Sequence, residues 1–137
     1  MTLQKNLILS KNHVDILKKH AKKNEPNESC AILFGKNEKE QFSIDEVFLT
    51  ESMEPSPINF TISNDELIKA YAESEKKKLE VIAIFHSHPS SAAYPSSTDQ
   101  KYMEINPIPW IIYSNTDDEI RAYILESTII PINVTVI

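Results

Sequence analysis

The chain has 137 residues, of which 41% are hydrophobic, so it can bury the core of a single domain spanning residues 1–137. Its 14 Lys plus Arg against 20 Asp plus Glu give a net charge of -6, which argues against nucleic acid as a partner because phosphate binding needs a surplus of cations. One cysteine and one glycine exclude an internal disulfide, a four-thiolate metal site and the glycine-rich phosphate loops.

The first predicted elements are a short strand at residues 7–9 and a helix over residues 11–23. Ser10 precedes the helix and can cap it, since its hydroxyl can accept a hydrogen bond from an amide of the first turn. Four lysines of this helix could form a phosphate-binding patch, but a run of like charge is more often a solvated face. These are Lys18, Lys19, Lys22 and Lys23.

Two strands are predicted next. Residues 29–34 form a short apolar run that ends at Gly35, which indicates a buried strand. Residues 41–50 alternate between apolar and polar types and predict a second strand, with an irregularity near Asp45-Glu46. The proline-containing segment 51–57 is predicted to be a loop.

A second helix is predicted to begin after Ser63, which forms a capping box with Glu66. It is expected to end at Lys76–Lys78, where positive charge suits the carboxyl end of a helix. One face of this helix carries apolar or small residues: Leu67, Ile68, Tyr71 and Ala72.

The second half of the chain supplies the centre of the predicted sheet. Residues 79–85 are nearly all apolar, as in a strand that is covered on both faces. A short helix and three closing strands follow, at residues 97–105, 108–113, 120–125 and 129–136, with a turn at 115–118. We therefore predict a mixed α+β fold, in which a central mixed β-sheet is flanked by two or three helices.

A candidate metal site lies just after this central strand. His86 and His88 are two residues apart in extended backbone, so their imidazoles project to the same side. Asp99 follows at the start of the predicted helix, where a turn could return its carboxylate to the histidines. Two imidazoles and a carboxylate are typical of a catalytic zinc that keeps one position for water. The alternatives are ordinary surface histidines and a helix-capping role for Asp99 or Thr98.

A zinc hydrolase also needs a proton carrier, and two acids precede the buried strand 29–34. Glu28 is better placed than Glu25 because it is closer to the strand. The alternative for Glu28 is an exposed loop acid with no role in chemistry.

Three further residues carry side chains that can act in catalysis or metal binding: Cys30, His13 and His20. Cys30 could act as a nucleophile with His86 or His88 as its base, but a cysteine in an apolar strand is usually an inert packed side chain. His13 and His20 are seven residues apart on one helix, about 10.5 Å along its axis. They are therefore too far apart to share one metal, and we expect them at the boundary of the core.

The positions of these residues resemble the motif of the JAMM (MPN-plus) metalloprotease family. That motif is a glutamate, then His-Ser/Thr-His-Pro, then seven residues from the proline onward, then Ser-x-x-Asp. The chain has Glu28, His86-Ser87-His88-Pro89, Ser96 and Asp99 at this spacing. The resemblance implies the MPN/JAMM architecture, which is cytidine-deaminase-like, across most of the chain.

The resemblance also implies a role for each motif residue. His86, His88 and Asp99 bind one Zn²⁺, which holds the attacking water. Glu28 accepts the proton of that water and passes it to the leaving amine. Ser96 orients the site and donates to the developing oxyanion. These roles agree with general chemistry, because the metal polarises the scissile carbonyl and a hydroxyl stabilises charge that appears in the transition state.

The chain departs from the family pattern at two places. Cys30-Ala31 stands where many members have Cys-Gly. Gln100 to Pro109 is too short for the insertion with which eukaryotic members hold a second ubiquitin. The chain is similar instead to compact prokaryotic and archaeal members, which remove ubiquitin-like small modifiers from lysines. We expect the Gly-Gly tail of such a modifier in a narrow cleft walled by residues 51–60 and Tyr94-Pro95.

Two other functions stay open at this point. One is a JAMM-type hydrolase that trims an amino acid or peptide from the C-terminus of a sulfur-carrier protein, and the other is a non-enzymatic MPN binding module. No apolar run approaches the roughly 20 residues of a membrane span, and residues 1–5 lead into no signal-peptide core. We therefore expect a soluble cytoplasmic protein without membrane partners, either a monomer or a homodimer.

Overall fold

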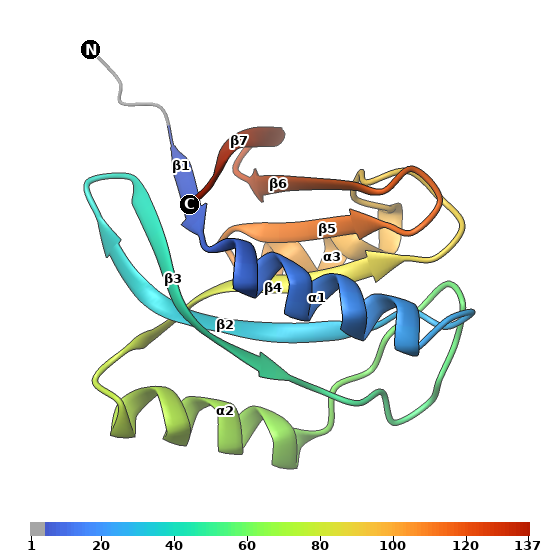
Figure 1. Cartoon of the computed structure of the whole chain (residues 1–137), viewed down its shortest axis with the longest axis horizontal. Helices are drawn as coiled ribbons and strands as arrows, with labels where there is room; N and C mark the ends of the chain where they lie inside the picture. Colours follow the sequence, from blue (N-terminus) through green and yellow to red (C-terminus); the bar gives the residue numbers. More distant parts are fainter. Residues whose placement is uncertain (1–4) are drawn as a thin grey trace.

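A computed structural model describes residues 5–137, which form one closed barrel with three helices around it (Figure 1). The expectation about a signal peptide rests largely on residues 1–4, which lie outside the described residues. In chain order the elements are β1 Asn6–Leu9, α1 Lys11–Lys23, β2 Cys30–Glu38, β3 Gln41–Leu49, α2 Asn64–Lys76, β4 Glu80–His88, α3 Ser97–Ile105, β5 Trp110–Ser114, β6 Glu119–Leu125 and β7 Ile129–Val136.

The strands follow the order β1-β3-β2-β4-β5-β6-β7, and β1 closes the barrel by pairing in parallel with β7. β4 lies in the middle of this order, antiparallel to β2 on one side and parallel to β5 on the other. The predicted mixed sheet, central strand and flanking helices are confirmed. The closure was not predicted, since it depends on β1 pairing with both β3 and β7.

Three apolar clusters hold the helices to the barrel. The largest fills the barrel and includes Leu17 and Ala21 of α1. A second packs Met103 of α3 against the single tryptophan, Trp110, and its neighbours. A third packs Ala70 of α2 against β2. Each helix therefore rests on the sheet through its own patch of apolar side chains.

Strand β2 is longer than predicted, because the chain runs on through Gly35 to Glu38 instead of stopping at the glycine. The pairing of β2 with β3 shifts at Phe34/Gly35, and Asp45 is the extra residue on β3, as the predicted irregularity indicated. A Cβ at Gly35 would lie 1.8 Å from the carbonyl oxygen of Ser43. Gly35 thus serves a close backbone approach rather than a strand end.

The predicted apolar face of α2 is confirmed at Leu67, which packs against the cluster of Ile32 and Phe34, but is wrong at the other three residues. Ile68, Tyr71 and Ala72 are exposed, whereas Ala70 and Ser74 are buried. The face that covers the sheet is therefore rotated from the one that local hydrophobicity indicated. Ser63 caps the helix as expected, but the Glu66 carboxylate accepts hydrogen bonds from the amide of Glu51.

Three chain segments approach one another at the end of β4. They are the residues just before β2, the last residues of β4, and the first turn of α3. The residues that the sequence singled out for chemistry lie on these segments. None of the helices within residues 5–137 is long and apolar enough to cross a membrane.

Candidate metal centre

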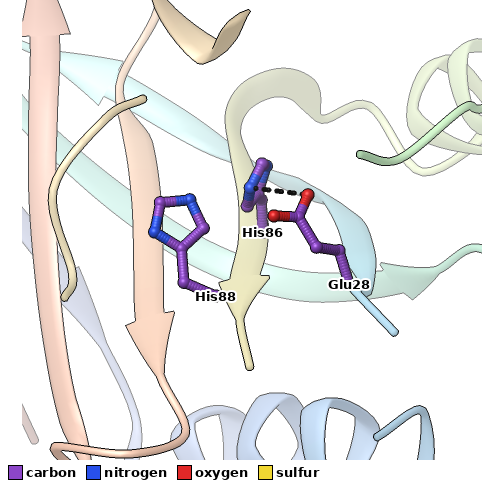
Figure 2. Close-up of side chains that lie close together, drawn as sticks. All are labelled: Glu28, His86 and His88. Carbon is purple, nitrogen blue, oxygen red and sulfur yellow. Dashed lines mark ion pairs between the residues drawn. The ribbon is translucent and has the colours of Figure 1, made fainter. Parts of the chain in front are cut away.

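His86 and His88 lie within the last three residues of β4 and project to the same side of the strand (Figure 2). Their ring centroids are 4.8 Å apart, with the planes inclined at 71°. Both side chains are buried, with 6% and 3% of their surfaces exposed. The alternative of ordinary surface histidines is therefore wrong.

Glu28 lies two residues before β2 and is brought to the histidines by antiparallel pairing of Cys30 with His86. Its Oε1 is 3.3 Å from His86 Nε2, the ion pair drawn in Figure 2. The Glu28 side chain is buried, which excludes the alternative of an exposed loop acid. Glu25 is exposed and accepts a hydrogen bond from the Asn115 side chain at 2.7 Å.

Asp99 reaches the histidines from the first turn of α3. Its Oδ1 is 3.4 Å from His86 Nε2, and its Oδ2 is 3.0 Å from His88 Nε2. Ser96 caps the helix: its Oγ accepts from the Asp99 amide at 3.1 Å, and its own amide donates to Asp99 Oδ2 at 2.9 Å. The N-cap is therefore Ser96, not Asp99 or Thr98. Asp99 completes the cap and contacts the histidines at once, because Oδ2 accepts from the Ser96 amide while facing His88, and Oδ1 faces His86.

The donor set fits a divalent cation. Ligand atoms of Glu28, His86 and His88 all lie within 4.8 Å of one another. Glu28 Oε1 and His86 Nε2 are buried and have no hydrogen-bond partner of good geometry, which is costly unless another group satisfies them. Sequence reasoning grouped Asp99 with the histidines, whereas this cluster contains Glu28. Asp99 contacts both imidazoles, so all four side chains border the same space.

The orientation of His88 is fixed by its second nitrogen. Nδ1 lies 2.8 Å from the carbonyl oxygen of Ala92 and donates to it, so Nε2 faces the acidic groups. Burial, the largest single influence, lowers the pKa of His88, but the hydrogen bonds to Asp99 and to the Ala92 carbonyl, together with the nearby acidic charges, raise it overall. Burial alone would raise the pKa of Asp99, whereas its contacts with His88 and His86 lower it. A carbonyl bonded to the distal nitrogen is the usual support of a metal-ligating histidine.

A cavity of about 230 Å³ opens beside this centre. Glu28, His86 and Asp99 form its polar end, and residues 58–62 form part of its wall. Of the predicted 51–60 wall only residues 58–60 line the cavity, and Tyr94-Pro95 does not. The remaining lining residues are mostly apolar or aromatic: Cys30, Leu67, Ile84, Thr98, Tyr102, Asn106 and Trp110.

Sequence reasoning missed the part that α3 plays in this cavity. Tyr102 and Asn106 lie three and seven residues after Asp99, so they fall on the same face of the helix. This spacing was available in the sequence. Nothing local marked Trp110, which reaches the cavity from β5, with its ring centroid 6.3 Å from that of His86.

The remaining candidates serve the structure. Cys30 is 4% exposed, and burial raises the pKa of its thiol to about 12, so the reactive thiolate is suppressed. His13 completes the cap of α1 with Ser10. His20 was expected at the core boundary and is buried, with Nε2 donating to the carbonyl of Cys30 at 3.0 Å.

The chain is similar to several known proteins in sequence and in fold. Residues 10–125 match Prok-JAB, described as prokaryotic homologs of the JAB domain. A desampylase of Pyrococcus furiosus is 36% identical over 72% of this chain and 66% of its own length, so the match spans slightly less than two thirds of that relative. A CysO-cysteine peptidase of Mycobacterium tuberculosis is 26% identical over 85% of this chain and 81% of its own.

Two further similarities were found. A probable TtuB-protein conjugate cleaving protease of Thermus thermophilus is 29% identical over 77% of this chain and 67% of its own. The solution structure of protein DSY2949 from Desulfitobacterium hafniense superposes with a TM-score of 0.87 at 21% identity, covering 96% of this chain and 92% of that one. At that identity the structural likeness supports the fold alone.

Proposed function

The chain belongs to the family of prokaryotic homologs of the JAB domain. Because its relatives include a desampylase, a peptidase and a conjugate cleaving protease, we propose that it is a zinc-dependent isopeptidase that removes ubiquitin-like modifiers from lysine side chains. One observation carries the proposal: buried Glu28, His86 and His88 converge within 4.8 Å, beside a cavity. Burying such polar and ionisable groups together costs free energy unless a partner such as a metal ion satisfies them.

We assign His86, His88 and Asp99 as the residues that would hold the zinc ion. When bound, zinc supplies Lewis-acid chemistry that activates water and polarises the scissile carbonyl. Neutral imidazole nitrogens and a carboxylate are suitable donors for it. The lowered pKa of Asp99 keeps that carboxylate ionised at neutral pH. The hydrogen bond from His88 Nδ1 to Ala92 holds the ring in place.

Glu28 is proposed as the general base and acid. Its Oε1 faces His86 at 3.3 Å and lines the cavity, so it can take up a proton from an attacking water and deliver it to a leaving amine. Ser96 is proposed to donate a hydrogen bond from its hydroxyl to the oxyanion, because its Oγ accepts from the Asp99 amide and leaves the hydroxyl hydrogen free. No enzyme-bound covalent intermediate is needed.

The substrate class rests on the relatives and on the cavity. A desampylase and a protease named for cleaving TtuB-protein conjugates are among them. A modifier tail ending in Gly-Gly can enter the cavity as an extended segment, with residues 58–62 along one side.

A second candidate has its own support. The CysO-cysteine peptidase matches over 85% of this chain, which favours a hydrolase that removes an amino acid from the C-terminus of a sulfur-carrier protein. Both reactions use the same metal centre and differ in the leaving amine. The non-enzymatic binding module is disfavoured, because such a role requires no buried set of ligand residues.

The deciding experiment combines metal analysis with two assays. Purified protein is expected to contain about one zinc ion per chain. It is then incubated with a modifier linked to a lysine side chain and, in parallel, with the same modifier carrying a C-terminal cysteine. Faster release from lysine supports the isopeptidase, and faster release of cysteine supports the second candidate.

Inhibitors test the chemistry itself. Chelation is expected to stop cleavage, with recovery when zinc is restored. Thiol alkylation is expected to leave the rate unchanged, because Cys30 is buried with a pKa of about 12. Inactivation by alkylation and resistance to chelation would overturn the zinc assignment in favour of a cysteine hydrolase.

A further inference from the structure

Ser87 lies between the two histidines of β4, yet no role has been assigned to it so far. Side chains alternate along a strand, so Ser87 points to the face opposite His86 and His88. It is fully buried, as is Ser29, the residue that follows Glu28. Two buried hydroxyls therefore lie directly behind the metal centre.

Three hydrogen bonds join these two serines. The Ser29 amide donates to Ser87 Oγ at 2.8 Å, the two hydroxyl oxygens are 2.8 Å apart, and the Ser87 amide donates to the Ser29 carbonyl at 3.0 Å. The first of these replaces a strand-to-strand backbone bond with a bond to a side chain. The hydroxyl of Ser87 thus extends the attachment of the two strands beyond the last paired residues, Cys30 and His86.

Glu28 depends on this attachment because it lies outside β2. Its own amide donates to the carbonyl of Ser56 at 2.8 Å, and the next amide along the chain is the one held by Ser87. These two bonds fix the peptide units on either side of the Glu28 Cα. The direction of its side chain toward His86 follows from them.

We propose that Ser87 is a positioning residue, whose hydroxyl sets the Glu28 carboxylate at its distance from His86 by holding the Ser29 amide. Its effect on catalysis rests on the proposed function, whereas its effect on the backbone does not. Displacement of a reacting group by about 1 Å can cost on the order of a hundredfold in rate. A loss of this hydroxyl should therefore act on turnover more than on substrate or metal binding.

The activity test uses Ser87→Ala. We expect kcat to fall about a hundredfold, with KM within about twofold of the wild type and zinc content unchanged, since neither histidine is altered. Ser29→Ala removes only the hydroxyl-to-hydroxyl bond and keeps the amide that Ser87 binds, so its kcat should fall much less. Ser74→Ala is the matched control: it removes a buried hydroxyl in α2, bonded to Tyr71 at 2.8 Å, and should leave kcat unchanged.

A second variant, Ser87→Cys, separates loss of the hydroxyl from a folding defect. Ser87→Cys nearly preserves the side-chain shape but offers only a weak sulfur acceptor, so it should repeat the loss of kcat with less disturbance of packing. The proposal is overturned if Ser87→Ala and Ser87→Cys keep wild-type kcat, if Ser29→Ala is as damaging as Ser87→Ala, or if the loss follows zinc content.

Amide hydrogen exchange, measured by nuclear magnetic resonance, tests the backbone claim without any substrate. The Ser29 amide is expected to exchange at least about tenfold faster in Ser87→Ala than in the wild type, with the Ala83 amide in the middle of β4 unchanged. Equal exchange at Ser29 in both proteins overturns the positioning role. If instead the wild type cleaves no modifier substrate, the proposed function fails, and the exchange rate still decides the role of Ser87.

Discussion

The chain contains two pairs of histidines, one on α1 and one on β4, and they have different surroundings. His13 and His20 are seven residues apart on a helix and bond to backbone: His13 accepts from the Ser10 amide at 3.4 Å, and His20 donates to the Cys30 carbonyl. His86 and His88 are two residues apart on a strand, with ring centroids 4.8 Å apart.

The difference lies in the partners. Each histidine of α1 has a ring nitrogen bonded to the main chain, His13 within its own helix cap and His20 across to β2. The histidines of β4 direct Nε2 toward carboxylates from two other segments, at 3.0 to 3.4 Å. Spacing along an element decides whether two rings can converge, and carboxylates decide whether convergence makes a metal site.

The contrast between the two pairs is tested most directly by replacing one histidine of each pair with glutamine. His86→Gln is expected to lose zinc and all turnover above that of chelated wild type, because two remaining donors do not retain the ion. His20→Gln should keep both, since it removes a structural hydrogen bond. Zinc content and cleavage rate are measured together. Full zinc in His86→Gln would contradict the assignment of this histidine as a ligand.

Glu28→Gln is expected to have the next largest effect. Loss of a general base lowers kcat by about 10²–10⁴-fold, and the zinc content should stay at the wild-type level. Glu25→Gln, an exposed acid of the same segment, is the matched control and should be unaffected. A parallel loss of zinc would instead make Glu28 a ligand, as its grouping with the histidines allows.

Ser10→Ala tests the structural role of His13. Removing the cap of α1 should lower the free energy of unfolding by about 1 kcal/mol, with kcat and zinc content unchanged. Chemical denaturation gives the stability. A change in metal content would mean that α1 is coupled to the centre, contrary to the separation of the two histidine pairs.

The smallest expected effect is on the pH dependence of folding stability, to which His20 and His88 contribute with opposite sign. Burial lowers the pKa of His20, so below pH 6.5 the unfolded chain binds a proton that the folded chain does not. Stability from His20 is thus lost as pH falls from 6.5 toward its folded pKa. In chelated protein the pKa of His88 is raised, so its contribution is present below 6.5 and lost as pH rises through the folded pKa.

Denaturation of chelated protein between pH 5 and 8 measures both contributions. His20→Gln should flatten the fall in stability on the acid side, whereas His88→Gln should flatten the fall toward higher pH. Identical pH profiles for the two variants would show that the surroundings of the pairs do not differ as described.

Local signals predicted much of the fold. Ser10 and the following lysine-rich stretch gave the bounds of α1, and Ser96 preceded a helix with the predicted bounds 97–105. Features that depend on contacts between distant segments could not be predicted from the local sequence. The face of α2 that contacts the sheet depends on where the helix docks, and the continuation of β2 beyond Gly35 depends on pairing with β3.

The candidate centre was predictable where its residues are close in sequence. His86, His88 and Asp99 lie within fourteen positions, 86 to 99. Glu28 was selected with the help of a family resemblance, since nothing near it in the sequence specifies pairing of its segment with β4. The bonds from Ser56 and Ser87 that fix its backbone involve residues 28 and 58 positions away from their partners.

Trp110 gives the protein a built-in optical reporter. It is the only tryptophan in the chain, and its indole borders the cavity with the ring centroid 6.3 Å from that of His86. Selective excitation therefore samples this one location. Loading of an ion or entry of a peptide tail can be followed by emission from the unlabelled protein, in real time and at low concentration.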